Sequence, residues 1–523
     1  MTTVLAVGAA GAGAWWLLRT TGSPAETAQL FAAAWQKGDT AAMTAQLAAA
    51  KPLTAYDQLR TGLAVEKTTV KLGAATPDKD GRAAVPYTAT LTLKNVGEWT
   101  YEGRFDLKVT DRAWKLDWSP ATLHPSMTDG AKFALKTSWP ERAAITDAEG
   151  DRIDTGQVGG SIQQLVGFLD KATKKDLAKL GPSYKLGQGV GRGGLQETFQ
   201  ERLAGTPTTE IQLGGKSLHT IDGEKGEGVE TTLEPAVQAA AVAAVKDLDK
   251  PAALVAVRTG TGQIAAVVNN RGGFDRAING RYPPGSTFKA VTAVGLLDAG
   301  VEPSEKVTCP KYATVGGLKI RNSEHGEYGS LSFSDSFAYS CNTSFAPLTQ
   351  EHLGAAKLLK AAEQVGFNQP LNIGVPAAKP SFPKAESDAE LAAESFGQAR
   401  ITASPLTMAS VAATLATGTW RPPTLVTDLE QKAKERQLPE GVSTKLGQMM
   451  SAVVTKGTAK AAGLPSGTRG KTGTAEYGTG PELDSHAWFM GYKGDLAFAV
   501  VVEGGGGGGK VAAPVAARFL KGM

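Results

Sequence analysis

The chain has 523 residues, of which 41% are hydrophobic and 20% are charged, and its net charge is +4 from 55 basic and 51 acidic side chains. This composition excludes wholesale disorder, and a chain of this length folds into about two to four domains. Because the charge is nearly balanced and forms no dense basic stripe, we do not expect nucleic-acid binding. Cys309 and Cys341 are too few for a disulfide framework; the sequence allows a bridge between them and does not establish one.

The first residues form an apolar stretch. Residues 2–18 carry no charge and end in Trp15, Trp16, Leu17 and Leu18. About 17 apolar residues is the short limit for crossing a bilayer, and tryptophan is common at the membrane interface. We therefore predict a membrane anchor over residues 1–20, with a cleaved signal peptide or a buried helix as alternatives.

Residues 23–128 are predicted to form a small α+β domain. Ser23 can cap a helix that carries Phe31 and Trp35 near helical spacing and ends at Gly38. We expect helices packed on a curved antiparallel sheet. Alternation of polar and apolar residues predicts strands over residues 87–93, 104–109 and 114–118.

Residues 135–228 are Gly-rich and less regular, and we predict a linker domain there with a helix from about Ile162 to Leu177. Residues 229–523 are predicted to form the largest domain. Its strands lie near both ends and helices fill the middle to about residue 460, which indicates one sheet assembled from distant parts of the chain. The expected elements are an Ala-rich helix over 237–245, strands over 252–257, 264–268, 488–492 and 496–502, a flexible turn over 504–509, and a last helix near residue 514.

A nucleophile and a base are suggested by Ser286 and Lys289, which open an apolar helix after a Pro-Pro-Gly turn. A spacing of three places both side chains on one helix face, so the amine can reach the hydroxyl. The helix N-terminus supplies N–H groups that suit a developing oxyanion. Ser381 and Lys384 repeat the spacing, but Pro383 between them excludes a helix interior, and we discard this copy.

Two more motifs follow, Ser340-Cys341-Asn342 and Lys471-Thr472-Gly473-Thr474. Ser-x-x-Lys, Ser-Asp-Asn and Lys-Thr-Gly together are the signature of penicillin-binding proteins and class A β-lactamases. The chain has all three in this order, with Cys in the middle of the second. Taken singly, Ser286 would be read as a helix cap, the second motif as a turn and Lys471 as a surface strand residue. Because the three motifs occur in the expected order and in suitable contexts, we favour a catalytic site over these structural interpretations.

Residues 140–523 resemble a class B penicillin-binding protein, and residues 25–125 resemble the cone-shaped N-terminal domain of methicillin-resistance-type members. The resemblance implies a multidomain α+β protein from a high-GC Gram-positive bacterium. Its transpeptidase domain would have the serine β-lactamase/penicillin-binding type of fold, an antiparallel sheet with helices on both sides. The segments that match include Phe274-Asp275-Arg276-Ala277, residues 284–289, Gly397-Gln398 and Gly457-Thr458-Ala459.

The resemblance also implies a peptidoglycan D,D-transpeptidase mechanism. Ser286 would attack the penultimate D-Ala carbonyl of a stem peptide, and Lys289 would take its proton. The pKa of Lys289 would have to fall from about 10.4 through burial and a nearby cation, Lys471. Ser340 would relay a proton to the leaving amine, and Asn342 would hold Lys289 and the substrate amide.

The remaining implied roles concern binding. Thr472, Gly473 and Thr474 would bind the substrate, and the N–H groups of Ser286 and Thr474 would form the oxyanion hole. The implied partners are stem peptides of lipid-linked or nascent glycan, β-lactam antibiotics and a cell-wall glycosyltransferase, with no metal, cofactor or nucleic acid. The catalytic domain would lie outside the cell membrane. Alternatives are a D,D-carboxypeptidase, a class D-like serine β-lactamase and a non-catalytic β-lactam sensor.

Overall fold

The structure is a computed structural model that describes residues 20–78, 80–155, 162–181, 183–478 and 483–523. The chain divides into two compact units. Unit 1 comprises residues 1–142, 171–189 and 204–226, and unit 2 comprises residues 143–170, 190–203 and 227–523.

The predicted anchor, residues 1–20, lies outside the described residues except for its last position. Over the described ranges, the structure contains no helix with the length and apolar character needed to cross a membrane.

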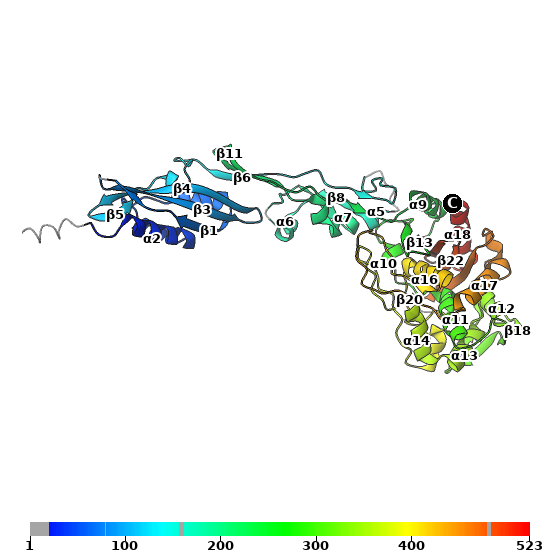
Figure 1. Cartoon of the computed structure of the whole chain (residues 1–523). Coiled ribbons are helices and arrows are strands. Elements are labelled where there is room, and N and C mark those ends of the chain that lie inside the picture. Colours follow the sequence, from blue (N-terminus) through cyan, green and yellow to red (C-terminus); the bar gives the residue numbers. More distant parts are fainter. Residues whose placement is uncertain (1–19, 79, 156–161, 182, 479–482) are drawn as a thin grey trace, which may run out of the picture. The chain divides into compact units, whose positions relative to one another are not determined.

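Unit 1 is an α+β unit, as predicted. Ser23 Oγ accepts the N–H of Glu26 and caps α2, and Gly38 ends this helix at φ 71°. Phe31 and Trp35 on α2 are buried against the sheet, where the rings of Phe31 and Phe105 lie 5.2 Å apart. The sheet runs in the antiparallel order β1-β3-β4-β5, with α2 beside it (Figure 1). The main elements are α2 (Pro24–Lys37), α3 (Thr40–Ala45), α4 (Thr54–Gly62), β1 (Val65–Leu72), β2 (Thr76–Pro77), β3 (Arg82–Leu93), β4 (Gly97–Thr110) and β5 (Ala113–Leu116), followed by the small sheet of β6 (Phe133–Ser138), β10 (Thr208–Leu213) and β11 (Lys216–Ile221).

Unit 2 is built on a five-stranded antiparallel sheet in the order β14-β13-β23-β22-β21. The first two strands and the last three come from opposite ends of the segment, so the prediction of a sheet assembled from distant parts is confirmed. Strands β13 and β23 are almost wholly buried because helices cover both faces of the sheet. The strands are β13 (Ala252–Arg258), β14 (Ile264–Asn269), β21 (Arg469–Tyr477), β22 (Asp484–Lys493) and β23 (Leu496–Val502).

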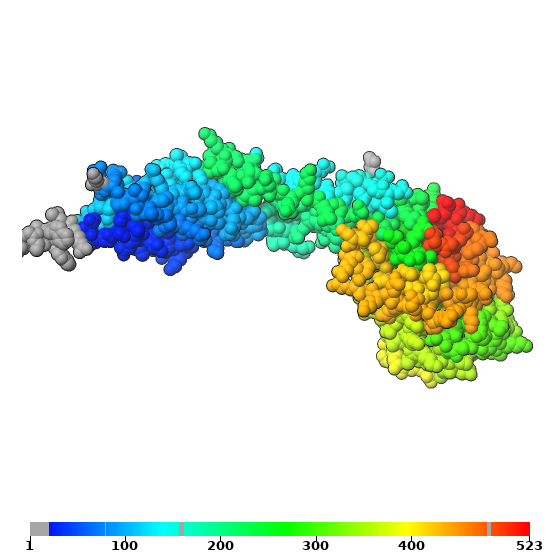
Figure 2. Space-filling model, in the orientation of Figure 1, coloured from blue at the N-terminus to red at the C-terminus, as the bar shows by residue number. Residues whose placement is uncertain are grey.

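Helices α9 and α18 pack together over one face of this sheet, and α16 covers the other (Figure 1). Figure 2 shows α18, in red, at the surface beside the green segment that includes α9. A mostly helical middle region completes the unit. The helices are α9 (Pro235–Val245), α10 (Arg276–Asn279), α11 (Lys289–Asp298), α12 (Phe333–Ala338), α13 (Asn342–His352), α14 (Gly354–Gln364), α15 (Asp388–Glu394), α16 (Pro405–Thr417), α17 (Val442–Thr455) and α18 (Ala512–Lys521).

Three local predictions were wrong. The helix expected from Ile162 to Leu177 is broken at Gly167, which has φ 83°. A Cβ atom at this position would lie 2.1 Å from the carbonyl oxygen of Gly193. The middle region, expected to be helical, contains hairpins. The glycines at 504–509 do not form a loose turn, because Gly508 packs against the backbone of β21. The segments concerned are α5 (Gln163–Val166), β8 (Phe168–Lys171) and α6 (Lys174–Leu180), and then β15 (Lys306–Cys309), β16 (Tyr312–Val315), β17 (Leu318–Arg321) and β18 (Gly329–Ser332).

Candidate active site

Ser286 lies in a short 3-10 helix, η2 (Gly285–Phe288), that runs directly into the buried helix α11. Gly285 has φ 54°, and a Cβ at this position would lie 2.7 Å from the carbonyl oxygen of Thr474 on β21. Only glycine permits both the left-handed backbone and this approach. The turn before the helix therefore brings Ser286 against the third motif.

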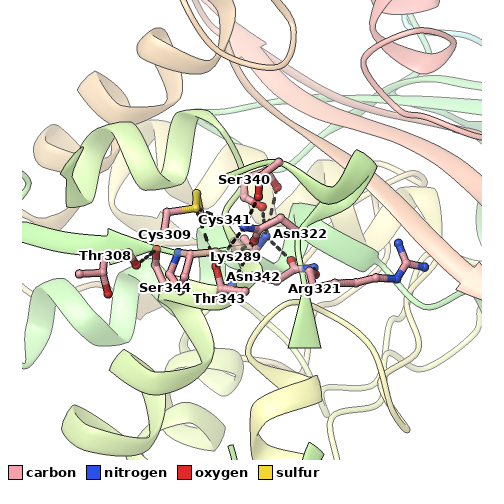
Figure 3. The surroundings of a disulfide bond; sticks show 12 residues. Lys289, Thr308, Cys309, Arg321, Asn322, Ser340, Cys341, Asn342, Thr343 and Ser344 are labelled. Carbon is pink, nitrogen blue, oxygen red and sulfur yellow. Dashed lines mark hydrogen bonds between the residues drawn. A yellow bond between two sulfur atoms is a disulfide. The ribbon is translucent and has the colours of Figure 1, made fainter. Parts of the chain in front are cut away.

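Lys289 is the first residue of α11 and is fully buried. Its Nζ lies 3.2 Å from Ser286 Oγ. It also lies 3.1 Å from Ser340 Oγ and donates to Asn342 Oδ1 and to the carbonyl of Ser340, each at 2.6 Å (Figure 3). Burial, and then the positive charge of Lys471, lowers the pKa of Lys289 well below its ordinary value. A neutral amine beside a serine hydroxyl can accept the hydroxyl proton.

Lys471 is the second buried amine of the site. Its Nζ donates to Ser340 Oγ at 2.9 Å and to the carbonyl of Thr472 at 3.0 Å. Burial lowers the pKa of Lys471 to about 7. Lys289 is disfavoured as a cation by both burial and Lys471, so Lys471 is the amine that retains the proton more readily. The Ser340 hydroxyl lies between the two amines and can exchange protons with either.

The second motif is a tight turn between α12 and α13. Ser340 has φ 62°, an unusual conformation for a residue with a side chain. The turn is held by two backbone hydrogen bonds, from Ser340 N–H to the carbonyl of Phe337 and from Cys341 N–H to the carbonyl of Ser336. Asn342 then begins α13. Strained backbone that is held from several sides is typical of functional positions.

Contacts with the neighbouring strands β15 and β17 also hold the second motif in place. Cys341 forms a disulfide with Cys309 on β15, the bridge that the sequence had left open (Figure 3). Asn342 Nδ2 donates to the carbonyl of Arg321 on β17 at 2.8 Å, while its Oδ1 accepts from Lys289. The amide of Asn342 is thereby fixed in one orientation.

The third motif lies on β21, an outer strand of the sheet. Gly473 packs against the turn before Ser286, since a Cβ there would lie 2.9 Å from the carbonyl of Pro284. The hydroxyls of Thr472 and Thr458 are 2.6 Å apart, and Thr474 Oγ1 accepts a long hydrogen bond of 3.4 Å from Gly508 N–H. The eight residues expected at the site from the sequence are thus close together in unit 2.

A cleft of about 230 Å³ opens beside Ser286, Asn342 and Thr474. Sequence reasoning missed most of its other lining residues. Nothing in the sequence marks the β16–β17 hairpin as part of a site, whereas Glu476 could have been found from strand alternation after Thr474. The missed residues are Leu318, Lys319, Ile320, Arg321, Ser323, Ala393, Phe396 and Glu476, whereas Gln398 was noted as part of a matching segment but not assigned to the site.

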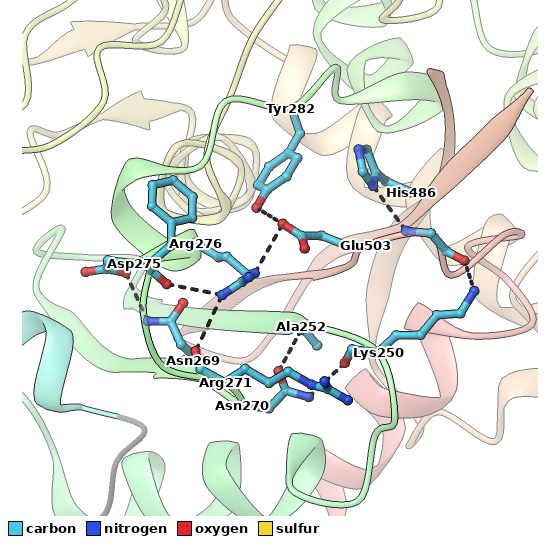
Figure 4. A network of polar contacts seen from close by, with 12 residues as sticks. Lys250, Ala252, Asn269, Asn270, Arg271, Asp275, Arg276, Tyr282, His486 and Glu503 are labelled. Atoms are coloured by element: carbon cyan, nitrogen blue, oxygen red, sulfur yellow. Dashed lines mark hydrogen bonds and ion pairs between the residues drawn. The ribbon is translucent and has the colours of Figure 1, made fainter. Parts of the chain in front are cut away.

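A polar network anchors the segment that leads to Ser286 (Figure 4). Tyr282 donates its hydroxyl to Glu503 at 2.6 Å, and Arg276 pairs with the same carboxylate at 3.2 Å. Asn269 Nδ2 donates to Asp275, which caps α10. Burial raises the pKa of both Tyr282 and Asp275 above their ordinary values. This network ties the turn to the ends of β14 and β23.

Comparison with known proteins agrees with this geometry. The family described as penicillin binding protein transpeptidase domain matches residues 252–521, and the family described as NTF2-like N-terminal transpeptidase domain matches residues 23–131. Peptidoglycan D,D-transpeptidase PbpA of Mycolicibacterium smegmatis is 30% identical over 335 residues, which cover 53% of this chain and 68% of that protein.

Two solved structures are also similar. Penicillin-binding protein A from M. tuberculosis, solved as a ceftriaxone acyl-enzyme complex, has a TM-score of 0.53 and 28% identity over 57% of this chain and 80% of that one. Pseudomonas aeruginosa PBP2 has a TM-score of 0.64 and 23% identity over 74% of this chain and 96% of that one, which shows a shared fold. The chain belongs to the penicillin-binding protein transpeptidase family and carries an NTF2-like N-terminal transpeptidase domain.

Proposed function

We propose that this chain is a peptidoglycan D,D-transpeptidase in which Ser286 is acylated by the stem peptide. The observation that carries the proposal is the contact of 3.2 Å between Ser286 Oγ and the buried amine of Lys289. Burial and Lys471 favour the neutral form of that amine, which is the form a general base requires. The M. smegmatis relative carries the name peptidoglycan D,D-transpeptidase, which supports the same substrate class.

Acylation begins when Ser286 Oγ forms a bond to the carbonyl carbon of the penultimate D-Ala, while Lys289 takes the hydroxyl proton. The C–N bond to the terminal D-Ala then breaks. Ser340, which lies within hydrogen-bond distance of both buried amines, passes a proton to the leaving nitrogen. Lys289 replaces that proton, so the site returns to its starting charge and a D-Ala molecule leaves.

The second half of the reaction reverses these steps with another amine. The acceptor nitrogen of a neighbouring stem forms a bond to the acyl carbon, and the ester bond to Ser286 breaks. The proton lost by the acceptor returns to Ser286 Oγ through Lys289. Asn342 Oδ1 accepts from the amine of Lys289 at 2.6 Å, and the Nδ2 hydrogen that does not bond to Arg321 would donate to the substrate amide.

Substrate binding is assigned to the third motif. Thr472, Gly473 and Thr474 form the edge against which the donor peptide lies, with the two threonine hydroxyls near its carboxylate. The N–H groups of Ser286 and Thr474 stabilise the oxyanion; the close approach of Gly285 to the Thr474 carbonyl supports their proximity. β-Lactams imitate the D-Ala-D-Ala end and trap Ser286 as a slowly hydrolysed ester.

Water instead of an amine would make the same site a carboxypeptidase. Incubation with a D-Ala thioester donor and a D-amino acid separates the two, because a transpeptidase forms the exchanged peptide faster than the hydrolysed acid. Labelled penicillin should attach to Ser286, as mapped by mass spectrometry, and should be released over many minutes.

Other outcomes identify the remaining alternatives. Penicillin turnover on the order of one per second or faster would indicate a β-lactamase and contradict the proposal. Stable penicillin labelling with neither exchange nor hydrolysis of the thioester would indicate a sensor. Among the described residues that line the cleft, the one carboxylate is Glu476, and it is paired with Arg321 instead of being positioned to activate water for deacylation.

The cellular setting is part of the proposal. Residues 1–20 would anchor the chain in the cell membrane and leave unit 2 outside, where lipid-linked or nascent glycan strands carry the stem peptides. A glycosyltransferase that polymerises those strands would be its partner. A fusion of residues 1–20 to a reporter tests the anchor, and recovery of the reporter in the soluble fraction would contradict it.

A further inference from the structure

Glu394, the last residue of α15, is completely enclosed by the protein. The residue is 0% exposed, and neither oxygen of its carboxyl group has a hydrogen-bond partner among the described residues. A buried polar group without a partner costs free energy, and an ionised one costs far more. Proteins satisfy nearly all of their buried polar atoms, so this carboxyl group calls for an explanation.

The surroundings favour the neutral form of this carboxyl group. Burial, and then the negative charge of Glu390, raises the pKa of Glu394 to about 8, while the positive charge of Arg400 acts in the opposite direction. Glu390 and Arg400 form an ion pair with each other. At neutral pH the protein therefore holds Glu394 as an uncharged carboxylic acid.

Other elements also contact α15 or the turn that follows it, and they carry ionisable residues. Among the described residues, however, the charges that act on Glu394 are those of Glu390 and Arg400. The ionisable residues of the neighbouring elements are Glu351 and His352 on α13, Tyr312 on β16, and Lys289 and Asp298 on α11.

Backbone hydrogen bonds connect Glu394 to the turn that carries Ser286. The carbonyl of Glu394 accepts the N–H of Gly397 at 3.0 Å, and the carbonyl of Gly397 accepts the N–H of Gly285 at 2.9 Å. Gly397 has φ 79°, and a Cβ atom there would lie 2.0 Å from the carbonyl oxygen of Gly285. Since Ser286 is the next residue, the turn at 394–397 lies directly against the backbone of the proposed nucleophile.

The same turn has further contacts with the site. Thr292, three residues after Lys289 on α11, donates its hydroxyl to the carbonyl of Ser395 at 2.8 Å. Phe396 and Gln398 line the cleft beside Ser286. A displacement at Glu394 would therefore reach the start of the nucleophile helix, the middle of that helix and the cleft wall.

We propose that Glu394 is a positioning residue for Ser286 and that it serves this role as a neutral carboxylic acid. Once ionised, the side chain has to reach water or a cation, so the end of α15 and the turn at 394–397 move. The backbone of Gly285 and Ser286 moves with them, and acylation slows. Lys289 then sets the acid limb and Glu394 the alkaline limb of a bell-shaped pH profile. This assignment rests on the proposed acylation of Ser286.

The rate of fluorescent-penicillin labelling as a function of pH tests the inference. One pH unit above the pKa of Glu394, about one molecule in eleven keeps the proton, so wild-type labelling should be about tenfold below its maximum. Glu394→Gln cannot ionise and should not show this fall. An alkaline fall caused by Lys471 would persist in Glu394→Gln, which separates the two causes. Glu351→Gln, which removes an exposed carboxylate from the adjacent helix α13, is the matched control and should keep the wild-type limb.

Urea unfolding at a series of pH values measures the charge state independently. Because the pKa of Glu394 is higher in the folded chain, wild-type stability should fall as the pH rises from about 4.5 to about 8. Glu394→Gln lacks this loss, so the difference between the two urea midpoints should widen across that window and stay constant above it. Glu394→Met, which is neutral and of similar volume, repeats both comparisons and shows whether the result depends on the amide.

The same alkaline limb in wild type, Glu394→Gln and Glu394→Met would overturn the positioning role. Urea midpoints whose difference does not change with pH would also overturn it, since Glu394 would then ionise alike in the folded and unfolded chains. Failure of penicillin to label the wild-type protein at any pH would instead count against the proposed function itself.

Discussion

Ser286 and Ser381 each precede a lysine by three residues, but the two segments have different surroundings. At the first, Lys289 Nζ lies 3.2 Å from the serine oxygen inside the protein. At the second, Ser381 exchanges backbone hydrogen bonds with Thr402 at 2.9 and 3.0 Å, and Lys384 is exposed. The first segment enters a helix, whereas the second is extended.

The difference shows that the environment, and not the spacing, makes the chemistry. Lys289 becomes a base because burial and a second lysine disfavour its charge, and the helical turn aims it at Ser286. The second segment contributes packing instead. Phe382 is buried and stacks on Phe288 of the first segment, with 5.3 Å between ring centroids. The segment with Ser286 and Lys289 is proposed to carry out the reaction, and the segment with Ser381 and Lys384 packs against it through Phe382.

The largest expected difference is between Lys289→Ala and Lys384→Ala. Loss of the base should lower the rate of penicillin labelling by about 10²- to 10⁴-fold, the usual contribution of a general base. Removal of the exposed lysine should leave the rate as it is. Fluorescent-penicillin labelling measures both, and thermal melts check that each variant is folded. Normal labelling of folded Lys289→Ala would mean that the base lies elsewhere.

Phe382→Ala should show that the second segment is structural. Truncation of a fully buried aromatic ring removes burial and leaves a cavity, which costs about 3–5 kcal/mol. Urea unfolding of unit 2, monitored by tryptophan fluorescence, measures the loss in free energy of unfolding. Phe382→Leu is the control, since it keeps much of the volume and should lose less. An unchanged unfolding midpoint for Phe382→Ala would contradict the packing role.

The pH dependence of labelling should depend on Lys471. Only neutral Lys289 accepts the serine proton, so labelling slows as the pH falls through the pKa of Lys289. Lys471 is a nearby cation that lowers this pKa, so its removal in Lys471→Ala should raise the pKa and move the acid limb to higher pH. The limb should stay in place in Lys384→Ala. A limb that does not move in Lys471→Ala would show that the two amines are not coupled.

The smallest effect is expected for Ser381→Ala. Its hydrogen bonds to Thr402 use the backbone, which the substitution preserves. The free energy of unfolding should change by less than about 0.5 kcal/mol, and labelling should be unaffected. A loss of labelling comparable to that of Ser286→Ala would overturn the distinction between the two segments.

Sequence reasoning reached the eight candidate site residues because their signals are local or form an ordered set of motifs. The spacing of three between Ser286 and Lys289 is that of one helix face, and strands β13 and β23 can be predicted from their own runs of hydrophobic residues. The buried environment of Lys289 was required by the expected chemistry, and the structure provides it.

The remainder depends on contacts between distant residues. The close approach of Gly167 to the carbonyl of Gly193 requires glycine where the helix breaks, and the tether of Asn342 is the backbone carbonyl of Arg321. Neither has a local pattern, because the partner could be any residue that offers a carbonyl. The strands of the middle region were missed for a related reason. Strands β15 and β18 have four residues each and pair across the segment that contains the β16–β17 hairpin, so the alternation within each strand is too short to recognise.

The bridge between Cys309 and Cys341 also matters to anyone who prepares the protein. Cys341 lies between Ser340 and Asn342, so oxidation or reduction of its disulfide changes a residue within the second motif. Material made in a reducing cytoplasm and material secreted through an oxidising compartment can share a mass to within two hydrogens and differ at this position. Titration of free thiols, either none or two per chain, should therefore accompany every labelling rate, so that preparations from different hosts can be compared.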